Sequence, residues 1–264
     1  MNERIPVLQT VGLNKTFGFG KNATHAVSES NLSFYKGEVV SIVGESGSGK
    51  TTLARMLLGL LKPSDGAILY QGKALDVSSL TQRKNYWHEV QAIFQDPFSS
   101  FNIFYKVEKL LLECLRFARR KMDGATEKKV ISDALSFVNM KLEEISGKYS
   151  FELSGGQMQR LMIARIFIMQ PEVLIADEPT SMIDACSRAT ILEMLLKLNK
   201  ERGMTILFIT HDMGLAYHIS DTIYIMEHGK LVESGAAEEV ISSPRHPYTI
   251  QLLADVPKLH QSWF

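Results

Sequence analysis

The segment from Gly44 to Thr51 constrains this chain more than any other, because its residues fit the pattern GxxxxGK[ST]. Average residue usage gives such a match odds of roughly 1% in a chain of this length. The apolar, β-rich run Val39–Val43 precedes it, and helical spacing over Thr51–Leu58 follows, ending near Gly59. This context points the loop amides and the helix start at one spot, where they can cradle a polyphosphate.

The residue types in this loop suit a nucleotide and a magnesium ion. Its three glycines let the backbone wrap closely around phosphates, Lys50 brings a positive charge to the β and γ oxygens, and Thr51 offers Mg²⁺ a hydroxyl ligand. The flanking strand and helix disfavour the alternative, a glycine-rich turn with a lysine in solvent. The predicted nucleotide-binding residues are Gly44, Glu45, Ser46, Gly47, Ser48, Gly49, Lys50, Thr51 and Thr52.

A second apolar run, Val173–Ala176, ends in Asp177 and Glu178. Both carboxylates are therefore predicted at the carboxyl edge of a parallel sheet, beside the phosphate loop. Asp177 is expected to hold the Mg²⁺ shell, and Glu178 to turn toward the attacking water as general base. Two solvated acids after a core strand are the alternative.

A second candidate anion site lies at a helix start, where Ser154, Gly155 and Gly156 precede the helical stretch Met158–Met169. One nucleotide cannot lie against both anion sites if they are on different lobes. The pattern therefore predicts a dimer in which each site is completed by a second subunit facing head to tail. A plain helix cap is the alternative.

Strand-like and helical segments alternate along the chain. The strands expected at Val173–Ala176 and Thr205–Ile209 are separated by a helical run that stops at Gly203, and this βαβ rhythm predicts a mostly parallel sheet. Between about Phe98 and Met169 the β signal fades and helical spacing dominates, which predicts an inserted helical subdomain.

Two polar segments are expected to connect these elements. Pro63–Gly66 is predicted to be a turn. Arg116–Lys129, which contains a polar hinge at Arg119–Lys129 between two helical stretches, is predicted to be a solvated connector. The alternative of a basic nucleic-acid patch there is disfavoured, because Asp123 and Glu127 interrupt it and no aromatic residues are interleaved.

The charge balance, the apolar stretches and the cysteines exclude several classes of protein. The 29 basic and 29 acidic residues give no net charge, so no whole-molecule field attracts nucleic acid or anionic lipid. The longest apolar stretch, Leu161–Ala176, contains Arg165 and falls short of the about 20 residues that a membrane-spanning helix needs. Cys114 and Cys186 form no CxxC, and the amino terminus has no apolar signal region. We therefore expect a protein of the reducing cytoplasm without zinc, iron-sulfur or disulfide chemistry.

Taken together, these motifs resemble those of the ATP-binding subunits of ABC transporters, across essentially the whole chain. In that family's terms Gly44–Thr51 resembles the Walker A loop, Leu153–Gln157 the LSGGQ signature, Asp177–Glu178 the Walker B end and Ser181–Asp184 the D-loop. The resemblance implies that Asp184 serves the D-loop. It also implies that the signature residues act on the nucleotide of a partner subunit, and these are Ser154, Gly155, Gly156 and Gln157.

The same resemblance implies roles for three further side chains. Gln95, in IFQDP, resembles the Q-loop glutamine, and His211, in ITHD, resembles the switch histidine that contacts the γ-phosphate. Phe17 resembles the aromatic residue that stacks on adenine, with Phe19 and core packing as competing interpretations. The implied catalytic residues are Glu178, His211 and Gln95, and the implied Mg²⁺ ligands are Thr51, Gln95 and Asp177.

The resemblance also implies a fold and an assembly. The fold is α/β, a P-loop NTPase (RecA-like) core with a mostly parallel sheet, an N-terminal antiparallel β region and an inserted helical subdomain. Residues 1–264 would form one cassette, with the ATPase core and β subdomain in 1–97 and 170–240, the helical signature subdomain in 98–169 and a C-terminal extension in 241–264.

The implied cofactors are ATP and Mg²⁺. The implied partners are a second, homologous ATP-binding subunit, as a heterodimer, two membrane permease subunits and, indirectly, an extracytoplasmic solute-binding protein, with no nucleic acid. The chain is expected at the cytoplasmic face of the cell membrane, as a peripheral subunit.

Within the ABC family, the C-terminal residues resemble those of ATPases from oligopeptide, dipeptide and nickel importers. His246–Thr249, Gln251–Ala254 and Val256–Pro257 resemble their carboxyl ends, and Gln95–Asn102 resembles their Q-loop region. Some members of that family are associated with oligosaccharide uptake, so peptide, nickel complex and oligosaccharide remain open as cargo. No cysteine follows Cys186, so the chain resembles the second ATPase of an unequal pair.

Two departures from the family pattern bear on the assembly. Asn102–Tyr105 stands where Asn-Pro-Arg is usual, and Met182–Ile183 stands where the D-loop usually has Ala-Leu. We predict that Phe98–Val107, with three successive large apolar side chains, docks the membrane subunit. The alternative is that this run belongs to the core of the helical subdomain.

Two other functions fit parts of the pattern. A soluble ABC ATPase that acts on DNA or the ribosome is disfavoured, because the chain has one cassette and lacks the long insertions of the DNA-repair proteins. A non-hydrolysing structural cassette is disfavoured because Lys50, Asp177, Glu178 and His211 are intact.

Overall fold

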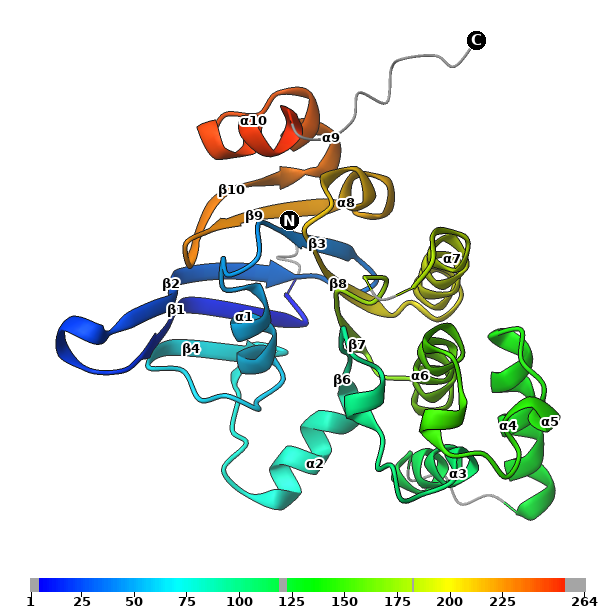
Figure 1. Cartoon of the computed structure of the whole chain (residues 1–264). Coiled ribbons are helices and arrows are strands. Elements are labelled where there is room, and N and C mark those ends of the chain that lie inside the picture. The colour runs from blue at the N-terminus through cyan, green and yellow to red at the C-terminus, as the bar shows by residue number, and fades with distance from the viewer. Residues whose placement is uncertain (1–4, 119–122, 182, 255–264) are drawn as a thin grey trace, which may run out of the picture. The chain divides into compact units, whose positions relative to one another are not determined.

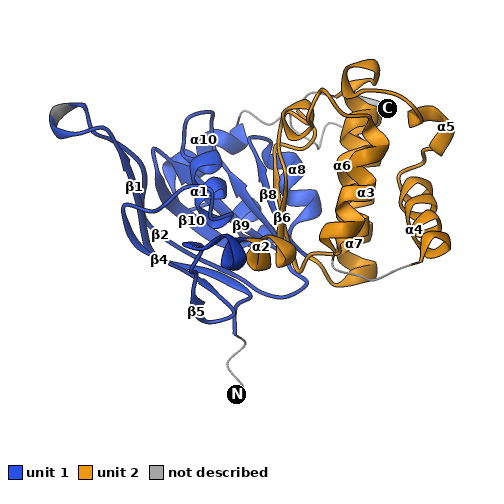
Figure 2. Ribbon diagram, turned by 90° about the horizontal axis from the view of Figure 1, so that it is seen from below, with its two compact units in different colours: residues 1–83, 205–264 blue, residues 84–204 orange. Residues whose placement is uncertain are grey.

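The computed structural model describes residues 5–118, 123–181 and 183–254. The chain divides into two compact units (Figure 2), one formed by Met1–Arg83 with Thr205–Phe264 and the other by Lys84–Met204. Residues 84–97 and 170–204, which the sequence assigns to the ATPase core, fall in the second unit. The predicted division at 98–169 therefore stays a prediction.

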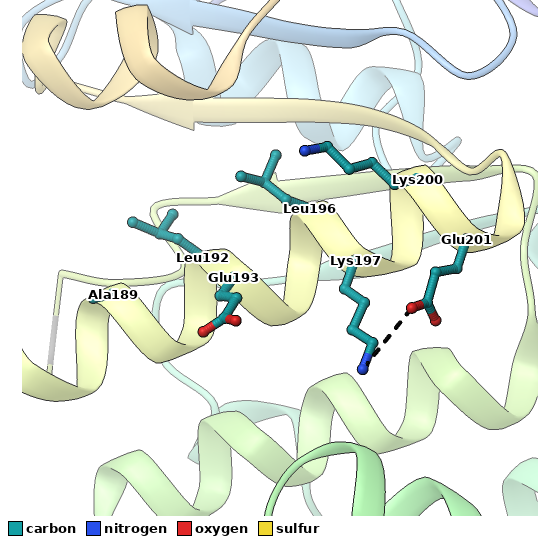
Figure 3. A pocket seen from close by; sticks show the side chains of 7 residues that line it. All are labelled: Ala189, Leu192, Glu193, Leu196, Lys197, Lys200 and Glu201. Carbon is teal, nitrogen blue, oxygen red and sulfur yellow. Dashed lines mark ion pairs between the residues drawn. The ribbon is translucent and has the colours of Figure 1, made fainter.

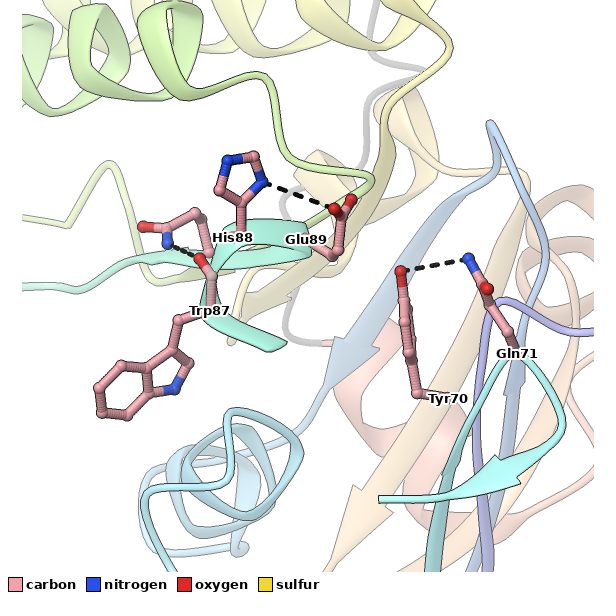
Figure 4. Close-up of polar contacts among 6 residues, drawn as sticks. Tyr70, Gln71, Trp87, His88 and Glu89 are labelled. Atoms are coloured by element: carbon pink, nitrogen blue, oxygen red, sulfur yellow. Dashed lines mark hydrogen bonds and ion pairs between the residues drawn. The ribbon is translucent and has the colours of Figure 1, made fainter. Parts of the chain in front are cut away.

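The first unit contains an antiparallel sheet with the strand order β2-β1-β4-β5. This confirms the predicted N-terminal antiparallel region. Gln71 and Gly72 both have positive φ and join β4 to β5 as a two-residue hairpin. Beside it, Gln71 Nε2 donates to Tyr70 Oη at 3.2 Å (Figure 4). The strands are β1 (Leu8–Phe17), β2 (Thr24–Phe34), β4 (Asp65–Tyr70) and β5 (Lys73–Ala74).

The turn predicted at Pro63–Gly66 is wrong in its second half, because β4 already begins at Asp65. Gly66 has φ +79, and a Cβ there would lie 2.1 Å from the carbonyl oxygen of Gly12. The register of β1 against β4 shifts at this point, between Val11 and Asn14. Gly66 is therefore required by a close approach of two strands at a bulge, and not by a reverse turn.

The first unit also contains strands in the order β10-β9-β3-β8, in which β3 runs parallel to both β8 and β9 (Figure 1). Every residue of β3 and β8 is buried, which is why both read as continuous apolar runs in the sequence. The strands are β3 (Val39–Val43), β8 (Thr205–Thr210), β9 (Thr222–Glu227) and β10 (Lys230–Ala236). The helices are η1 (Gly20–Asn22), α1 (Lys50–Leu57), α8 (Met213–Ile219), α9 (Ala237–Ser242) and α10 (Pro247–Ala254).

In the second unit, β6 (Val90–Ile93) pairs parallel with β7 (Val173–Asp177). The buried helix α6 (Gly155–Met169) packs against α3, α4 and α7. Arg165 interrupts the apolar face of α6 because its guanidinium donates to the carbonyl of Ala92 in β6. The other helices are η2 (Phe98–Ser100), α3 (Val107–Phe117), α4 (Gly124–Phe137), α5 (Leu142–Ile145), η3 (Ser150–Glu152) and α7 (Ala185–Arg202).

Helix α2 (Leu80–Glu89) begins in the first unit and leads into β6. Near its end, His88 Nδ1 lies 3.5 Å from a carboxylate oxygen of Glu89, and the side chain of Gln91 donates to the carbonyl of Trp87 (Figure 4). These contacts close the turn between the helix and the strand.

The solvated connector predicted at Arg116–Lys129 is wrong at both ends, because α3 continues to Phe117 and α4 begins at Gly124. Asp123 caps this helix, since its carboxylate accepts a hydrogen bond from the amide of Thr126 at 2.9 Å. Hydrogen bonds from Thr126 lower the pKa of Asp123. Residues 119–122 of the predicted connector lie outside the described residues.

The parallel strands and the antiparallel N-terminal sheet confirm the predicted α/β class. The helical run that the sequence places before Gly203 is α7, and Gly203 closes it in the left-handed conformation. Among the described residues, no helix is long and apolar enough to cross a membrane.

Candidate nucleotide site

In the first unit, the glycine-rich loop connects the end of β3 to the start of α1, as predicted. Lys50 is buried inside the loop. Its Nζ donates to the carbonyl oxygens of Gly44 at 2.6 Å and Glu45 at 2.7 Å, and to the hydroxyl of Ser48 at 3.3 Å. The loop is thus folded around its own ammonium group, while its tip at residues 45–47 is exposed. An entering phosphate would meet a charge that is already placed.

Two glycines of this loop are required by neighbouring backbone. A Cβ on Gly44 would lie 2.1 Å from the carbonyl oxygen of Met226, and a Cβ on Gly49, which has φ +106, would lie 2.1 Å from that of Ala26. Gly47 has φ +85, and no atom lies within 4 Å of its Cβ position. Of the three glycines expected to admit phosphates, Gly47 therefore fits that role best, while Gly44 seats the loop against β9 and Gly49 seats it against β2.

The start of α1 fits an anion. Gly49 is its N-cap in the left-handed conformation and offers no side-chain acceptor, and its first turn carries no acidic residue. The first amides and the positive end of the helix dipole therefore face the loop without a capping side chain. Together with Lys50, these groups fit the phosphates of a nucleotide.

His211 lies at the same edge of the sheet as the loop. Val43 of β3 pairs with Thr210 of β8, so Gly44 and His211 follow directly from paired residues of neighbouring strands. His211 is exposed, and the turn that carries it is fixed because the Asp212 amide donates to the Thr210 hydroxyl at 3.0 Å. The first unit thus brings the loop and the histidine to one edge.

Phe17 ends β1 with 44% of its surface exposed, and Phe19 beyond it is 96% exposed. The alternative interpretation, that these rings pack in the core, is therefore wrong for both. Lys15 Nζ lies 5.2 Å from the centre of the Phe17 ring, a cation-π contact that orients it. Stacking of Phe17 on adenine stays a prediction.

In the second unit, Gln95, Asp177 and Glu178 come to one edge. Ile93 of β6 pairs with Ala176 of β7, so Gln95 and the two acids leave their strands side by side. Asp177 is buried, Glu178 is half-buried and Gln95 is exposed. The oxygen ligands of Thr51, Gln95 and Asp177 suit the hard ion Mg²⁺ in their donor chemistry.

Glu178 adopts φ +47, the left-handed region that residues with a side chain rarely use. Such a conformation costs about 1 to 3 kcal/mol and persists where the surrounding structure enforces it. The hydroxyl and the amide of Ser181 donate to the Glu178 carbonyl at 3.1 and 3.3 Å, which closes this turn. The strain marks Glu178 as a residue whose direction is set by its surroundings.

Sequence reasoning missed Gln159. This residue of α6 is buried, and its Nε2 donates to the carbonyl oxygen of Pro179 at 2.6 Å. It ties the helix that follows the signature to the turn that carries Glu178. The available signal was a glutamine among the core-facing apolar residues of α6, a position where a polar side chain needs a specific partner.

The signature residues form a reciprocal helix cap. The Ser154 hydroxyl accepts from the Gln157 amide at 3.2 Å, and the Gln157 side-chain oxygen accepts from the Ser154 amide at 3.0 Å. Both members of this cap are within reach of solvent. The cap that sequence reasoning offered as the alternative is therefore present, and action on a partner's nucleotide stays a prediction.

Asp184 caps α7, since its carboxylate accepts from the Ser187 amide at 2.9 Å. Of the two D-loop departures, Met182 lies outside the described residues. A surface pocket along α7, lined by Leu192, Leu196 and their neighbours on that helix, includes none of the predicted site residues (Figure 3).

Comparison with known proteins identifies the family. The family model described as "ABC transporter" matches residues 27–181, more than half of the 264-residue chain. The oligopeptide transport ATP-binding protein OppF of Streptococcus pyogenes serotype M1 is 39% identical over 258 residues, which cover 97% of this chain and 83% of OppF. AmiF of Streptococcus pneumoniae, also an oligopeptide transport ATP-binding protein, is similar to the same extent. OppF of Haemophilus influenzae is 38% identical over 92% of this chain and 74% of its own length.

Solved structures agree. The ATP-binding cassette MJ0796, in a dimeric post-hydrolysis state bound to ADP and Pi, superposes with a TM-score of 0.78 at 28% identity, covering 87% of this chain and 98% of that one. CbiO1 of Clostridium perfringens, part of the CbiONQ ABC transporter complex, gives 0.76 at 30% identity, covering 90% and 91%. The loop, the strand-end acids and these similarities agree: the chain belongs to the ABC transporter family, as one of its ATP-binding subunits.

Proposed function

We propose that this chain is an ATP-hydrolysing subunit that powers an importer for oligopeptides. One structural observation carries the hydrolytic part, namely Lys50 buried at the start of α1 with its ammonium held inside an exposed, glycine-rich loop. The cargo rests on the relatives, which are named for oligopeptide transport and are matched over most of their length. A nickel complex or an oligosaccharide is the alternative cargo, and uptake assays with each solute distinguish them.

In the proposed mechanism of ATP hydrolysis, each predicted site residue named below has its own role. The loop amides and Lys50 bind the β and γ phosphates, and Thr51, Gln95 and Asp177 hold Mg²⁺, which when bound neutralises charge on the phosphate oxygens. Glu178 takes a proton from the attacking water. His211 donates a hydrogen bond to the γ-phosphate. These residues come from both units, so the proposal requires both units to act on one nucleotide.

The proposed assembly contains two such subunits. The helix start at Ser154–Gln157, where Ser154 is exposed and the other three residues are half-buried, acts on the nucleotide bound to a second, homologous ATP-binding subunit, and the two close head to tail. Two membrane permeases take up the motion, and a solute-binding protein delivers the cargo to them. The chain works at the cytoplasmic face of the membrane without entering it. DNA or the ribosome as partner is not supported, since the relatives reported above are transport proteins.

The predicted docking segment Phe98–Val107 is wrong at its last residue, because Val107 is buried in α3. The docking surface for the membrane subunit is proposed at Ile103, Phe104 and Tyr105, which are 54%, 79% and 46% exposed. The alternative that these residues form the core of the helical subdomain is therefore wrong. Lys106, which follows Tyr105, pairs with Tyr149, whose ring stacks on the exposed ring of Phe151 with 5.5 Å between the ring centres. An exposed group of large apolar side chains of this kind is typical of an interaction site.

Phe104→Asp is expected to leave the isolated subunit folded, with basal ATPase activity unchanged, and to abolish assembly with the permeases. The charge stays in water in the free subunit and is desolvated only at the interface. Melting temperature, ATP turnover and co-purification with the permeases measure the three properties.

Two control variants distinguish loss of docking from loss of folding. Leu80→Asp, at another exposed apolar position, is expected to preserve assembly, and Leu111→Asp, in the buried face of α3, is expected to destabilise the chain by about 3 to 5 kcal/mol. A large drop in melting temperature for Phe104→Asp, or full assembly, would exclude Phe104 from the docking surface.

A further inference from the structure

The C-terminal tail of the first unit, formed by α9 and α10, packs against the strand that leads into the phosphate loop. Tyr248 and Leu252 of α10 belong to one buried cluster with Val43, the last residue of the strand that leads into the loop, and with Met213 of α8. Figure 1 shows α9 and α10 next to β10 at this end of the unit. The tail is therefore part of the structure that supports the loop.

One hydrogen bond connects the tail to the loop itself. The backbone amide of Glu45 donates to the hydroxyl oxygen of Tyr248 at 2.9 Å. The carbonyl oxygen of Glu45 accepts from Lys50 Nζ at 2.7 Å. The backbone of one loop residue thus links a tyrosine of α10 to the lysine that faces the phosphates.

We propose that Tyr248 is a positioning residue of the nucleotide site, which holds the Gly44–Glu45 peptide in the orientation that places Lys50 for phosphate binding. This inference rests on the proposed function, since it takes the loop to bind Mg-ATP. Tyr248 touches neither the nucleotide nor Mg²⁺ in this proposal, and it acts through the backbone of Glu45.

The tyrosine is itself held rigidly. The carboxylate of Glu233 in β10 accepts from the amides of Arg245 at 2.8 Å and His246 at 3.0 Å, just before α10 begins at Pro247. The Tyr248 amide donates to His246 Nδ1 at 3.3 Å. Because only 8% of Tyr248 is exposed, its ring has little freedom to leave the loop.

The chemistry of the phenol suits this role. Burial raises the pKa of Tyr248, so the hydroxyl stays protonated and neutral at physiological pH. A neutral hydroxyl oxygen accepts the Glu45 amide without adding negative charge beside a site for phosphates. The next exposed residues of the loop, Ser46 and Gly47, carry no comparable contact to the tail among the described hydrogen bonds.

The expected consequence follows from preorganisation. Without the hydroxyl, the Gly44–Glu45 peptide samples other orientations, and the fraction of loops ready to bind falls. Loss of one such hydrogen bond corresponds to about two- to tenfold weaker binding. Nucleotide affinity is therefore expected to change, while turnover at saturating ATP stays the same, since Tyr248 has no contact that forms only in the transition state.

Tyr248→Phe tests this directly in the full chain. We expect the dissociation constant for Mg-ATP, measured by titration calorimetry, to rise about two- to tenfold. Exchange of the Glu45 amide with deuterium should accelerate while amides elsewhere in the unit keep their rates, whereas a general loss of packing would accelerate exchange across the unit. Tyr224→Phe is the matched control, because its hydroxyl lies within 3.5 Å of the backbone of Ser33, which belongs to β2 of the same unit and not to the loop.

The outcomes separate the two claims. Weaker binding by Tyr248→Phe alone supports the inference, whereas unchanged affinity, or an equal loss in Tyr224→Phe, overturns it. If Tyr248→Phe does not fold, Glu233→Gln, which weakens the support of α10, is expected to raise the dissociation constant in the same direction, and no change would overturn the inference. Failure of the unaltered chain to bind Mg-ATP would instead contradict the proposed function.

Discussion

Glu178→Gln is expected to bind Mg-ATP as the unaltered chain does and to lose turnover by about 10²- to 10⁴-fold. The amide keeps the shape of the side chain but does not accept the proton of the attacking water. Glu178 sits in a strained turn at the edge that it shares with Gln95, so a substitution of the same shape should preserve the local fold.

Separate measurements of ATP affinity and phosphate release check this prediction. The slow variant should also accumulate as an ATP-bound dimer, which sizing chromatography in Mg-ATP detects. Glu193→Gln, at an exposed position on α7, is the matched control and should turn over normally. Hydrolysis near the parental rate by Glu178→Gln would show that another group is the general base.

Lys50→Ala is expected to weaken ATP binding itself, by about 10- to 100-fold, because the ammonium makes charge-assisted bonds to phosphate oxygens in the bound state. The loop should also loosen, since Nζ donates to the carbonyls of both Gly44 and Glu45 in the free protein. Both effects act before the chemical step. The dissociation constant for Mg-ATP should therefore rise, and the variant should not differ from the unaltered chain in turnover alone.

Titration calorimetry with Mg-ATP measures this change, with Lys230→Ala as a control for the loss of an exposed lysine in the same unit. Loss of turnover with unchanged ATP affinity would contradict the role given to Lys50. Equal weakening by Lys230→Ala would show that the effect is one of overall charge.

The sequence predicts the elements of this fold where local pattern and burial agree. The β-rich runs at Val39–Val43, Val173–Ala176 and Thr205–Ile209 are mostly apolar without alternation, because the parallel strands that contain them are buried along their full length. The helix that stops at Gly203 is predictable for a similar local reason, since only a glycine closes it at low cost in the left-handed conformation.

Contacts between segments that are distant in the sequence cannot be predicted from such local patterns. Glu45 and Tyr248 are 203 positions apart, and Gln159 reaches Pro179 from another helix. The glycine-rich loop was predictable as a phosphate loop, but the reason for Gly44 and Gly49 is the backbone of strands that no local window includes.

The apolar run at Ile103–Tyr105 shows a second limit of local pattern. Three large apolar residues in succession are compatible with a core or with an interface, and exposure in the folded chain decides between them. The turn predicted at Pro63–Gly66 was wrong for a related reason. Proline and glycine indicate a turn in the local sequence, whereas Gly66 lies at a bulge between two strands.

We propose that ATP hydrolysis by this chain drives solute import. Its most direct measurement is oligopeptide uptake into vesicles that contain the assembled transporter, with Mg-ATP on the cytoplasmic side and either the unaltered chain or Glu178→Gln. We expect uptake coupled to phosphate release with the unaltered chain, and loss of both with the variant, although the complex still assembles and binds ATP. Uptake that continues at the parental rate with Glu178→Gln would contradict it.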